Sequence, residues 1–182
     1  MSMLRRSGTV LTGVIVAALV TVFIMAGPAI AASADDPTFS VPQSLLEQFD
    51  NDNRARELAG QEARLARYDA RRGERAAALS RLEQAIKLAA QIQGIRKRTV
   101  ALVNIATVQA EVGDSQGALH TVSTIQSLTE RDSTLRTMAF DRAKAGDVET
   151  ATVYANAIQD TWKKTDATRY IEALQSVKPL GF

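Results

Sequence analysis

Apolar residues recur every three or four positions through most of the chain from about residue 53, which is the spacing of amphipathic helices. The clearest example spans residues 98–125, RTVALVNIATVQAEVGDSQGALHTVSTI. It predicts a helix, a tight turn at Gly113-Asp114 and a second helix. The first of these helices, predicted over 96–112, is apolar around most of its circumference. We therefore expect it to lie buried between neighbouring helices.

The same pattern returns at a fixed interval. Ile92-Gln93, Ile125-Gln126 and Ile158-Gln159 are evenly spaced, since 125 − 92 = 33 and 158 − 125 = 33. Gly113-Asp114 recurs as Gly146-Asp147 at the same interval, since 146 − 113 = 33. A period of this length is typical of a helical solenoid, in which each helix pair buries its apolar face against its neighbours. The sequence thus predicts an all-α fold made of stacked helix pairs.

A longer copy of the unit precedes these two. Gly73-Glu74 follows Leu65-Ala66 as Gly113-Asp114 follows Ile105-Ala106, but here 113 − 73 = 40 instead of 33. The seven extra residues are close to two helical turns, so they lengthen the second helix without turning its apolar face out of the core. Helices are predicted over 54–72, 74–93, 96–112, 114–125, 131–145, 147–162 and 166–177, within a repeat domain over 53–178 that a short tail, 179–182, follows.

Residues 1–31 have the order of an export signal. Arg5 and Arg6 precede a long uncharged run, Val10–Met25, and Gly27-Pro28 ends this run. Ala29–Ala31 then offers the small residues that a signal peptidase requires. We predict a signal peptide over 1–31 and export, most simply to the periplasm. The alternative is an uncleaved inner-membrane anchor with the repeat domain outside the cytoplasm, and only then is a membrane a partner.

A flexible acidic tether is predicted over 32–52. It is small and polar and carries Pro37 and Pro42, which favour extended chain. Ser44 and Glu47 have the spacing of a capping box for a short helix. Asp50–Asn53 is predicted to interrupt that helix, because these side chains bond their own backbone. The chain has no cysteine, so a disulfide is not available to stabilise it.

Charge becomes balanced once the signal is removed. The two arginines lost with it leave 22 − 2 = 20 basic against 20 acidic residues. The simplest support for a nucleic-acid partner disappears, and none is expected. Residues 54–98 nevertheless hold twelve bases against five acids. Solvated helix faces explain this most simply, and a basic patch for an acidic polymer or a lipid headgroup is the alternative.

Residues able to carry catalysis or hold a metal are scarce. His120 is the only histidine and there is no cysteine, so a His/Cys metal site and a Cys–His nucleophile are excluded. The turn glycines follow the repeat and do not form a phosphate loop. Tyr154 and Trp162 are expected to pack in the core near the last helix pair, and the alternative is an exposed binding cluster. We expect no enzymatic activity, no metal and no cofactor.

The apolar-Ala pair Ile105-Ala106, followed by Ala110, Gly113-Asp114 and Ala118, resembles the tetratricopeptide repeat, of an exported bacterial type, over about 54–177. The period here is one position shorter than is usual for that family. Gln109 and Arg142 stand where the family often has tyrosine, and its usual proline is missing. The resemblance implies a right-handed superhelix whose first helices line a concave groove for a peptide or a partner protein. Mapped onto this chain, the groove-facing positions are Arg67, Val103, Thr107, Glu111, Arg136, Phe140 and Arg169.

Two functions are consistent with these observations. The first is a non-catalytic exported scaffold that binds a protein or peptide in its groove. The alternative is an accessory protein whose arginine-rich first repeat binds an acidic polymer or a lipid headgroup. Loss of binding between low and physiological ionic strength would favour the alternative, since exposed charges are screened by salt. Three to four units are near the minimum for a stable array, so self-association through its ends is also predicted.

Overall fold

A computed structural model of the chain describes residues 41–176. The chain divides into two units, Met1–Val41 and Pro42–Phe182, and all described residues except Val41 belong to the second. The predicted signal peptide, most of the predicted tether and the tail at 179–182 lie outside the described residues.

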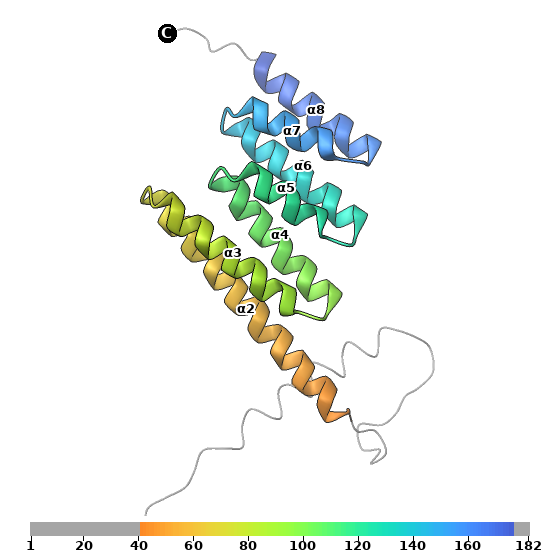
Figure 1. Cartoon of the computed structure of the whole chain (residues 1–182). Helices are drawn as coiled ribbons and strands as arrows, with labels where there is room; N and C mark the ends of the chain where they lie inside the picture. The colour runs from red at the N-terminus through yellow and green to blue at the C-terminus, as the bar shows by residue number, and fades with distance from the viewer. Residues whose placement is uncertain (1–40, 177–182) are drawn as a thin grey trace, which may run out of the picture. The chain divides into compact units, whose positions relative to one another are not determined.

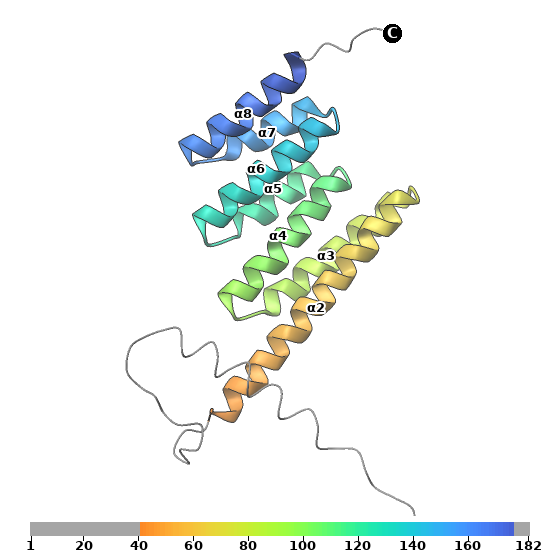
Figure 2. The same ribbon diagram turned by 180° about the vertical axis from the view of Figure 1, so that it is seen from behind.

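Between residues 41 and 176 the structure is all-α, with seven helices and no strand. The helices are α2 (Gln43–Arg71), α3 (Arg75–Gln91), α4 (Ile95–Glu111), α5 (Ser115–Ser123), α6 (Leu128–Lys144), α7 (Val148–Ala157) and α8 (Thr161–Ser176). Helices α2/α3, α4/α5 and α6/α7 form three antiparallel hairpins stacked side by side, and α8 follows them (Figure 1). We call α2, α4, α6 and α8 the first helices. They form one layer, seen in front in Figure 2, and α3, α5 and α7 form the other.

Glycine turns join the two helices of each hairpin along one edge of the stack. Gly73, Gly113 and Gly146 have φ angles of +80°, +80° and +81°, in the left-handed region that favours glycine. In each turn the N–H of the residue after the glycine donates to a carbonyl in the last turn of the preceding helix, as in Asp114 N to Gln109 O at 2.8 Å. This pattern closes the helix end and confirms the turns predicted from the repeat.

The core between the layers consists largely of alanine. Ala106 and Ala139 in first helices, and Ala118 and Ala151 in second helices, are all fully buried. Their small side chains let neighbouring backbones approach closely. Larger buried side chains fill the space around them, namely Leu82, Ile92, Ile105, Ile125, Met138 and Tyr154.

Helix α2 is continuous from Gln43 to Arg71, so the predicted interruption at Asp50–Asn53 is wrong and residues 43–52 are helical, not a tether. Asp52 is buried, and its carboxylate accepts hydrogen bonds from the N–H groups of Gln93 at 2.9 Å and Gly94 at 2.8 Å. These bonds satisfy the loop that leads into α4. They outweigh the weak preference of Asp and Asn for turns, because tertiary partners override local propensity.

Helix α7 ends at Ala157 and α8 begins at Thr161, so the predicted helix through Trp162 is also wrong. The intervening loop is held by the buried carboxylate of Asp132, which accepts from the N–H groups of Gln159 at 3.1 Å and Asp160 at 2.8 Å. Trp162 therefore lies in the first turn of α8 and is 67% exposed, not in the core. None of the helices within 41–176 combines the length and the apolar character that crossing a membrane would need.

Candidate functional site

The seven predicted groove residues all lie on first helices, in the layer that Figure 2 shows in front. The structure does not bring them together into one site. It joins Arg67 with Glu111 across α2 and α4, and it places Arg136 and Phe140 against α8. Val103 and Thr107 lie on α4 between these two groups.

Arg67 and Glu111 form a two-pronged ion pair between neighbouring hairpins. Arg67 Nη2 donates to Glu111 Oε1 at 2.9 Å, and Arg67 Nε donates to Oε2. Hydrogen bonding to Glu111 raises the pKa of Arg67, although partial burial opposes this shift. Because each group already satisfies the other, the pair joins α2 to α4 and leaves little free charge for a ligand.

Val103 and Thr107 offer a ligand no free side-chain hydrogen-bond donor. Val103 is partly buried and packs against the core. The hydroxyl of Thr107 donates to the carbonyl of Val103 at 2.8 Å, within the same helix. These two residues therefore contribute mainly to the packing of α4 and give this part of the face no charge.

An arginine surrounded by aromatic rings joins α6 to α8. The guanidinium carbon of Arg136 lies 5.0 Å from the ring centre of Phe140 and 5.4 Å from that of Trp162. Arg136 Nε lies 2.7 Å from Asp166 Oδ2, and the rings of Phe140 and Tyr170 are 4.4 Å apart between centres. We call these five residues the Arg136 cluster.

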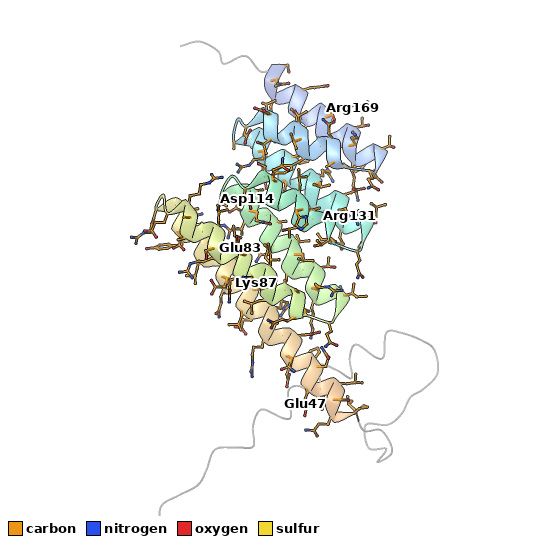
Figure 3. The ribbon with its side chains drawn as sticks, viewed as in Figure 1. Glu47, Glu83, Lys87, Asp114, Arg131 and Arg169 are labelled. Carbon is orange, nitrogen blue, oxygen red and sulfur yellow. The ribbon has the colours of Figure 1, made fainter. Side chains whose placement is uncertain are left out.

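The Arg136 cluster is ordered by its own contacts yet open to solvent on one side. Arg136 Nε and Asp166 Oδ2 are buried atoms in charge contact, but neither has a hydrogen bond of good geometry within the described residues. Trp162 is the most exposed large apolar side chain of the described part. Arg169, labelled on α8 in Figure 3, is exposed and forms no ion pair within residues 41–176. Rings over a guanidinium with an exposed tryptophan form a surface suited to binding.

Sequence analysis missed two members of the cluster, Asp166 and Tyr170, and considered Trp162 as a binding residue only as the alternative to core packing. A usable signal was present in the spacing, since 166 − 136 = 30 and 170 − 140 = 30. This spacing is one repeat less about one helical turn. A side chain on α6 therefore meets a residue on α8 that lies about one turn before its own repeat equivalent. A comparison of equivalent repeat positions does not reveal such pairs.

Half of the arginines of the first hairpin are engaged with the protein itself. Arg75, for example, donates to the carbonyls of Val112 at 3.2 Å and Gly113 at 3.1 Å, across to the next hairpin. Three more arginines form ion pairs: Arg67 with Glu111, Arg72 with Glu74, and Arg81 with both Glu62 and Asp69. The arginines on α2 that are exposed and lack an ion pair within 41–176 are Arg54, Arg56, Arg64 and Arg71.

No three His, Asp or Glu side chains of residues 41–176 come together in a way that could hold a metal ion. Comparison with protein-family models, with curated proteins and with solved structures finds no match to this chain. The geometry of the helical unit is therefore the basis for any inference about function.

Proposed function

We propose that this protein is a non-catalytic, exported scaffold that binds a protein or peptide partner on the face of its first helices. In this proposal the stacked hairpins form a right-handed, tetratricopeptide-like superhelix. Residues 1–31 act as a signal peptide, and the mature protein functions in the periplasm. The main support is the Arg136 cluster, which includes the exposed side chain of Trp162.

The composition of the cluster favours a role in binding. The few residues that carry most of the binding energy in protein interfaces are enriched in tryptophan, tyrosine and arginine, which combine large apolar area with polar groups. Arg136 is already held between Phe140, Trp162 and Asp166. Little side-chain freedom remains to be lost when a partner binds, and such preorganisation strengthens binding.

The cluster also indicates the chemistry of the partner. Trp162 offers an uncovered apolar ring, and the charge of Arg136 faces Asp166. Arg169 supplies an exposed positive charge on the same helix. A segment with an apolar or aromatic side chain for Trp162 and an acidic group for Arg169 fits this arrangement.

The alternative, an acidic ligand on the first hairpin, has weaker support. Arg67, Arg72, Arg75 and Arg81 are engaged with internal partners, which leaves the four exposed arginines of α2 to act together. Binding by such exposed charges should fall steeply between low and physiological salt. Binding at the Arg136 cluster should depend less on salt, because it rests largely on apolar contact.

A cross-linked pull-down from envelope fractions tests the proposal. The full chain would be compared with a Trp162→Ala, Arg169→Glu double variant, whose two side chains are exposed and contribute little to the core. Lys87→Glu, an exposed charge reversal on α3 in the other layer, is the matched control (Figure 3). A specific partner recovered by the wild type and the control but lost from the double variant would support the proposal. Recovery of the same partners by all three would contradict it.

A further inference from the structure

Exposed apolar side chains also occur at the start of every first helix. Leu45, Ile95, Leu128 and Trp162 lie in the first turns of α2, α4, α6 and α8 and are 59%, 57%, 48% and 67% exposed. Ile95 and Leu128 are the first residues of their helices and stand one repeat apart, since 128 − 95 = 33. We call these four residues the loop-edge row.

The row follows one edge of the stack. The loops that precede α4, α6 and α8 lie along the edge opposite the glycine turns, and both views show this arrangement (Figures 1 and 2). Helix α2 begins on the same side, because Asp52 in its third turn binds the loop before α4. The first turns of α4, α6 and α8 therefore lie along this edge, and the first turn of α2 projects beyond it on the same side (Figures 1 and 2).

Folding does not account for these side chains. The starts of α6 and α8 are capped by polar side chains, as Ser127 Oγ accepts from Glu130 N at 3.3 Å and Asp160 Oδ1 accepts from Lys163 N at 2.8 Å, whereas α2 and α4 have no side-chain cap. Polar and acidic residues or proline suit the first helical turn better than large apolar ones. Side chains exposed to this degree add little to the core. Their burial requires something outside the helical unit.

Basic side chains accompany each member of the row on α4, α6 and α8. Arg96, Lys97 and Arg98 follow Ile95, Arg131 follows Leu128, and Lys163 and Lys164 follow Trp162. Three of these basic groups donate hydrogen bonds to backbone carbonyls at this edge. Lys97 Nζ donates to Phe49 O at 3.2 Å, Arg131 Nη2 to Ile125 O at 2.9 Å and Lys163 Nζ to Thr129 O at 3.2 Å. Apolar side chains with an exposed tryptophan and adjacent lysine and arginine are typical of the boundary between lipid and water.

The chain before α2 points to the same occupant. The described part begins beside the first turn of α2, and the uncharged run Val10–Met25 precedes it in the sequence. Only the segment 26–42 separates this run from Gln43. That segment spans at most about 60 Å when extended. In the anchored form, in which residues 1–31 are not cleaved, the loop edge therefore stays within reach of the membrane surface.

We propose that the loop-edge row docks on the lipid surface of a membrane and inserts its apolar side chains among the headgroups. The adjacent basic groups face lipid phosphates. This site differs from the arginine-rich face of the first hairpin. It shares Trp162 with the peptide-binding proposal but does not rest on it, because Leu45, Ile95 and Leu128 lie outside the Arg136 cluster. Docking through this edge leaves the glycine-turn edge pointing away from the bilayer.

The chain carries its own reporter for this proposal, because Trp162 is its only tryptophan. The full chain would be reconstituted into phosphatidylcholine vesicles with and without phosphatidylglycerol, at a low ratio of protein to lipid. We expect a blue-shifted Trp162 emission, quenching by lipids brominated on their acyl chains and protection from aqueous iodide. Phosphatidylglycerol should strengthen all three effects because of the basic side chains.

Variants separate docking by the row from other causes. Ile95→Ser, Leu128→Ser should shift the equilibrium between docked and undocked states about tenfold for each side chain, and so restore iodide quenching. Val153→Ser, Leu174→Ser, which changes two exposed apolar residues outside the row on α7 and α8, is the matched control and should behave as the wild type. Circular dichroism would check that helicity is unchanged. Because Trp162 also touches Arg136, the response to Ile95 and Leu128 shows that the row itself is responsible.

Three results would overturn the proposal. Trp162 could remain open to iodide and unaffected by brominated lipid on vesicles. Its protection could be the same in the Ile95→Ser, Leu128→Ser variant. Its protection could also need no lipid, either rising with protein concentration, as a second copy would cause, or appearing only when an envelope extract is added, as a protein partner would cause.

Discussion

Asp52 of α2 and Asp132 of α6 occupy equivalent positions in the first and third hairpins. Each buried carboxylate accepts two N–H groups from the loop that follows its hairpin, and the residues joined are 41 apart for Asp52–Gln93 and 27 apart for Asp132–Gln159. The difference is 41 − 27 = 14 residues, or seven for each helix of the hairpin. Counted from the aspartate, each helix of the first hairpin is therefore about two turns longer than its counterpart in the third. Lys97–Phe49 and Lys163–Thr129 repeat this relationship, since 48 − 34 = 14.

Removing either carboxylate should destabilise the fold. Asp52→Asn and Asp132→Asn each replace an oxygen that accepts a backbone N–H by an amide group that cannot accept it. We expect each change to lower the free energy of unfolding by about 1–3 kcal/mol, measured by urea denaturation. Asp50→Asn, an exposed change on the same helix, should cost less than about 0.5 kcal/mol. Wild-type stability in Asp52→Asn would show that the loop does not depend on this carboxylate.

The contribution of Asp52 should depend on pH. Burial alone would raise the pKa of Asp52, but the N–H groups of Gln93 and Gly94, with Gln48 and Lys97, hold it below its usual 3.8. The folded state therefore favours the charged form. Its stabilisation is complete above the unfolded pKa and is lost as the pH falls through the lower folded pKa. The stability difference between wild type and Asp52→Asn should be constant from pH 7 to 5 and shrink below about pH 4. A difference that stays constant down to pH 2 would contradict this account.

The middle hairpin lacks this arrangement and should have the most labile loop. The equivalent positions are Thr99, since 132 − 33 = 99, and Glu130, since 163 − 33 = 130. The N–H groups of Gln126 and Ser127 have no acceptor within residues 41–176. Hydrogen exchange measured by mass spectrometry should therefore be faster at 126–127 than at 93–94 or 159–160. Thr99→Asp should slow exchange at 126–127, and unchanged exchange there would contradict the equivalence.

The outer face of the first hairpin should mediate self-association. Leu65, Ile105 and Met138 each stand eight positions before a turn glycine, yet Leu65 is 42% exposed while the other two are buried. Ile105 and Met138 have a preceding hairpin beside them, and within the described residues α2 has none. Sedimentation equilibrium should show association at high micromolar concentration that Leu58→Ser, Leu65→Ser abolishes. A strictly monomeric mass for the wild type would contradict this prediction.

Tyr154 should weaken the fold at alkaline pH. Burial raises the pKa of its phenol, and Ser115 opposes the shift only in part. The folded state favours the neutral phenol. Ionisation of Tyr154 therefore leaves the free energy of unfolding unchanged below the unfolded pKa of about 10 and lowers it as the pH rises above that value. The hydroxyl is buried without a hydrogen-bond partner of good geometry among the described residues. Tyr154→Phe should be as stable as wild type or more so at pH 7, and its advantage should grow above pH 10. A loss of more than about 1 kcal/mol at pH 7 would show that the hydroxyl is well bonded.

Local signals predicted the hairpin turns correctly, and the buried alanines follow the helical period. Gly113 adopts a backbone conformation that depends mainly on its own lack of a side chain, and Ala106 and Ala118 follow the helical period. The same local reasoning failed at Asp50–Asn53 and at Trp162. At the first, the partners of Asp52 lie 41 and 42 positions further along the chain. At the second, Asp132 holds the loop before α8 across 27 and 28 positions.

Periodicity determines that this chain forms stacked helical hairpins, because a regular repeat places equivalent apolar faces at equivalent heights. It also determines where the hairpins turn. Only the packed structure decides which charges remain free, since Arg67 and Glu111 satisfy each other while Arg169 finds no ion pair within the described residues. It also decides that Trp162 meets Arg136 at the surface. These outcomes depend on distances between helices, and no short stretch of sequence contains both partners.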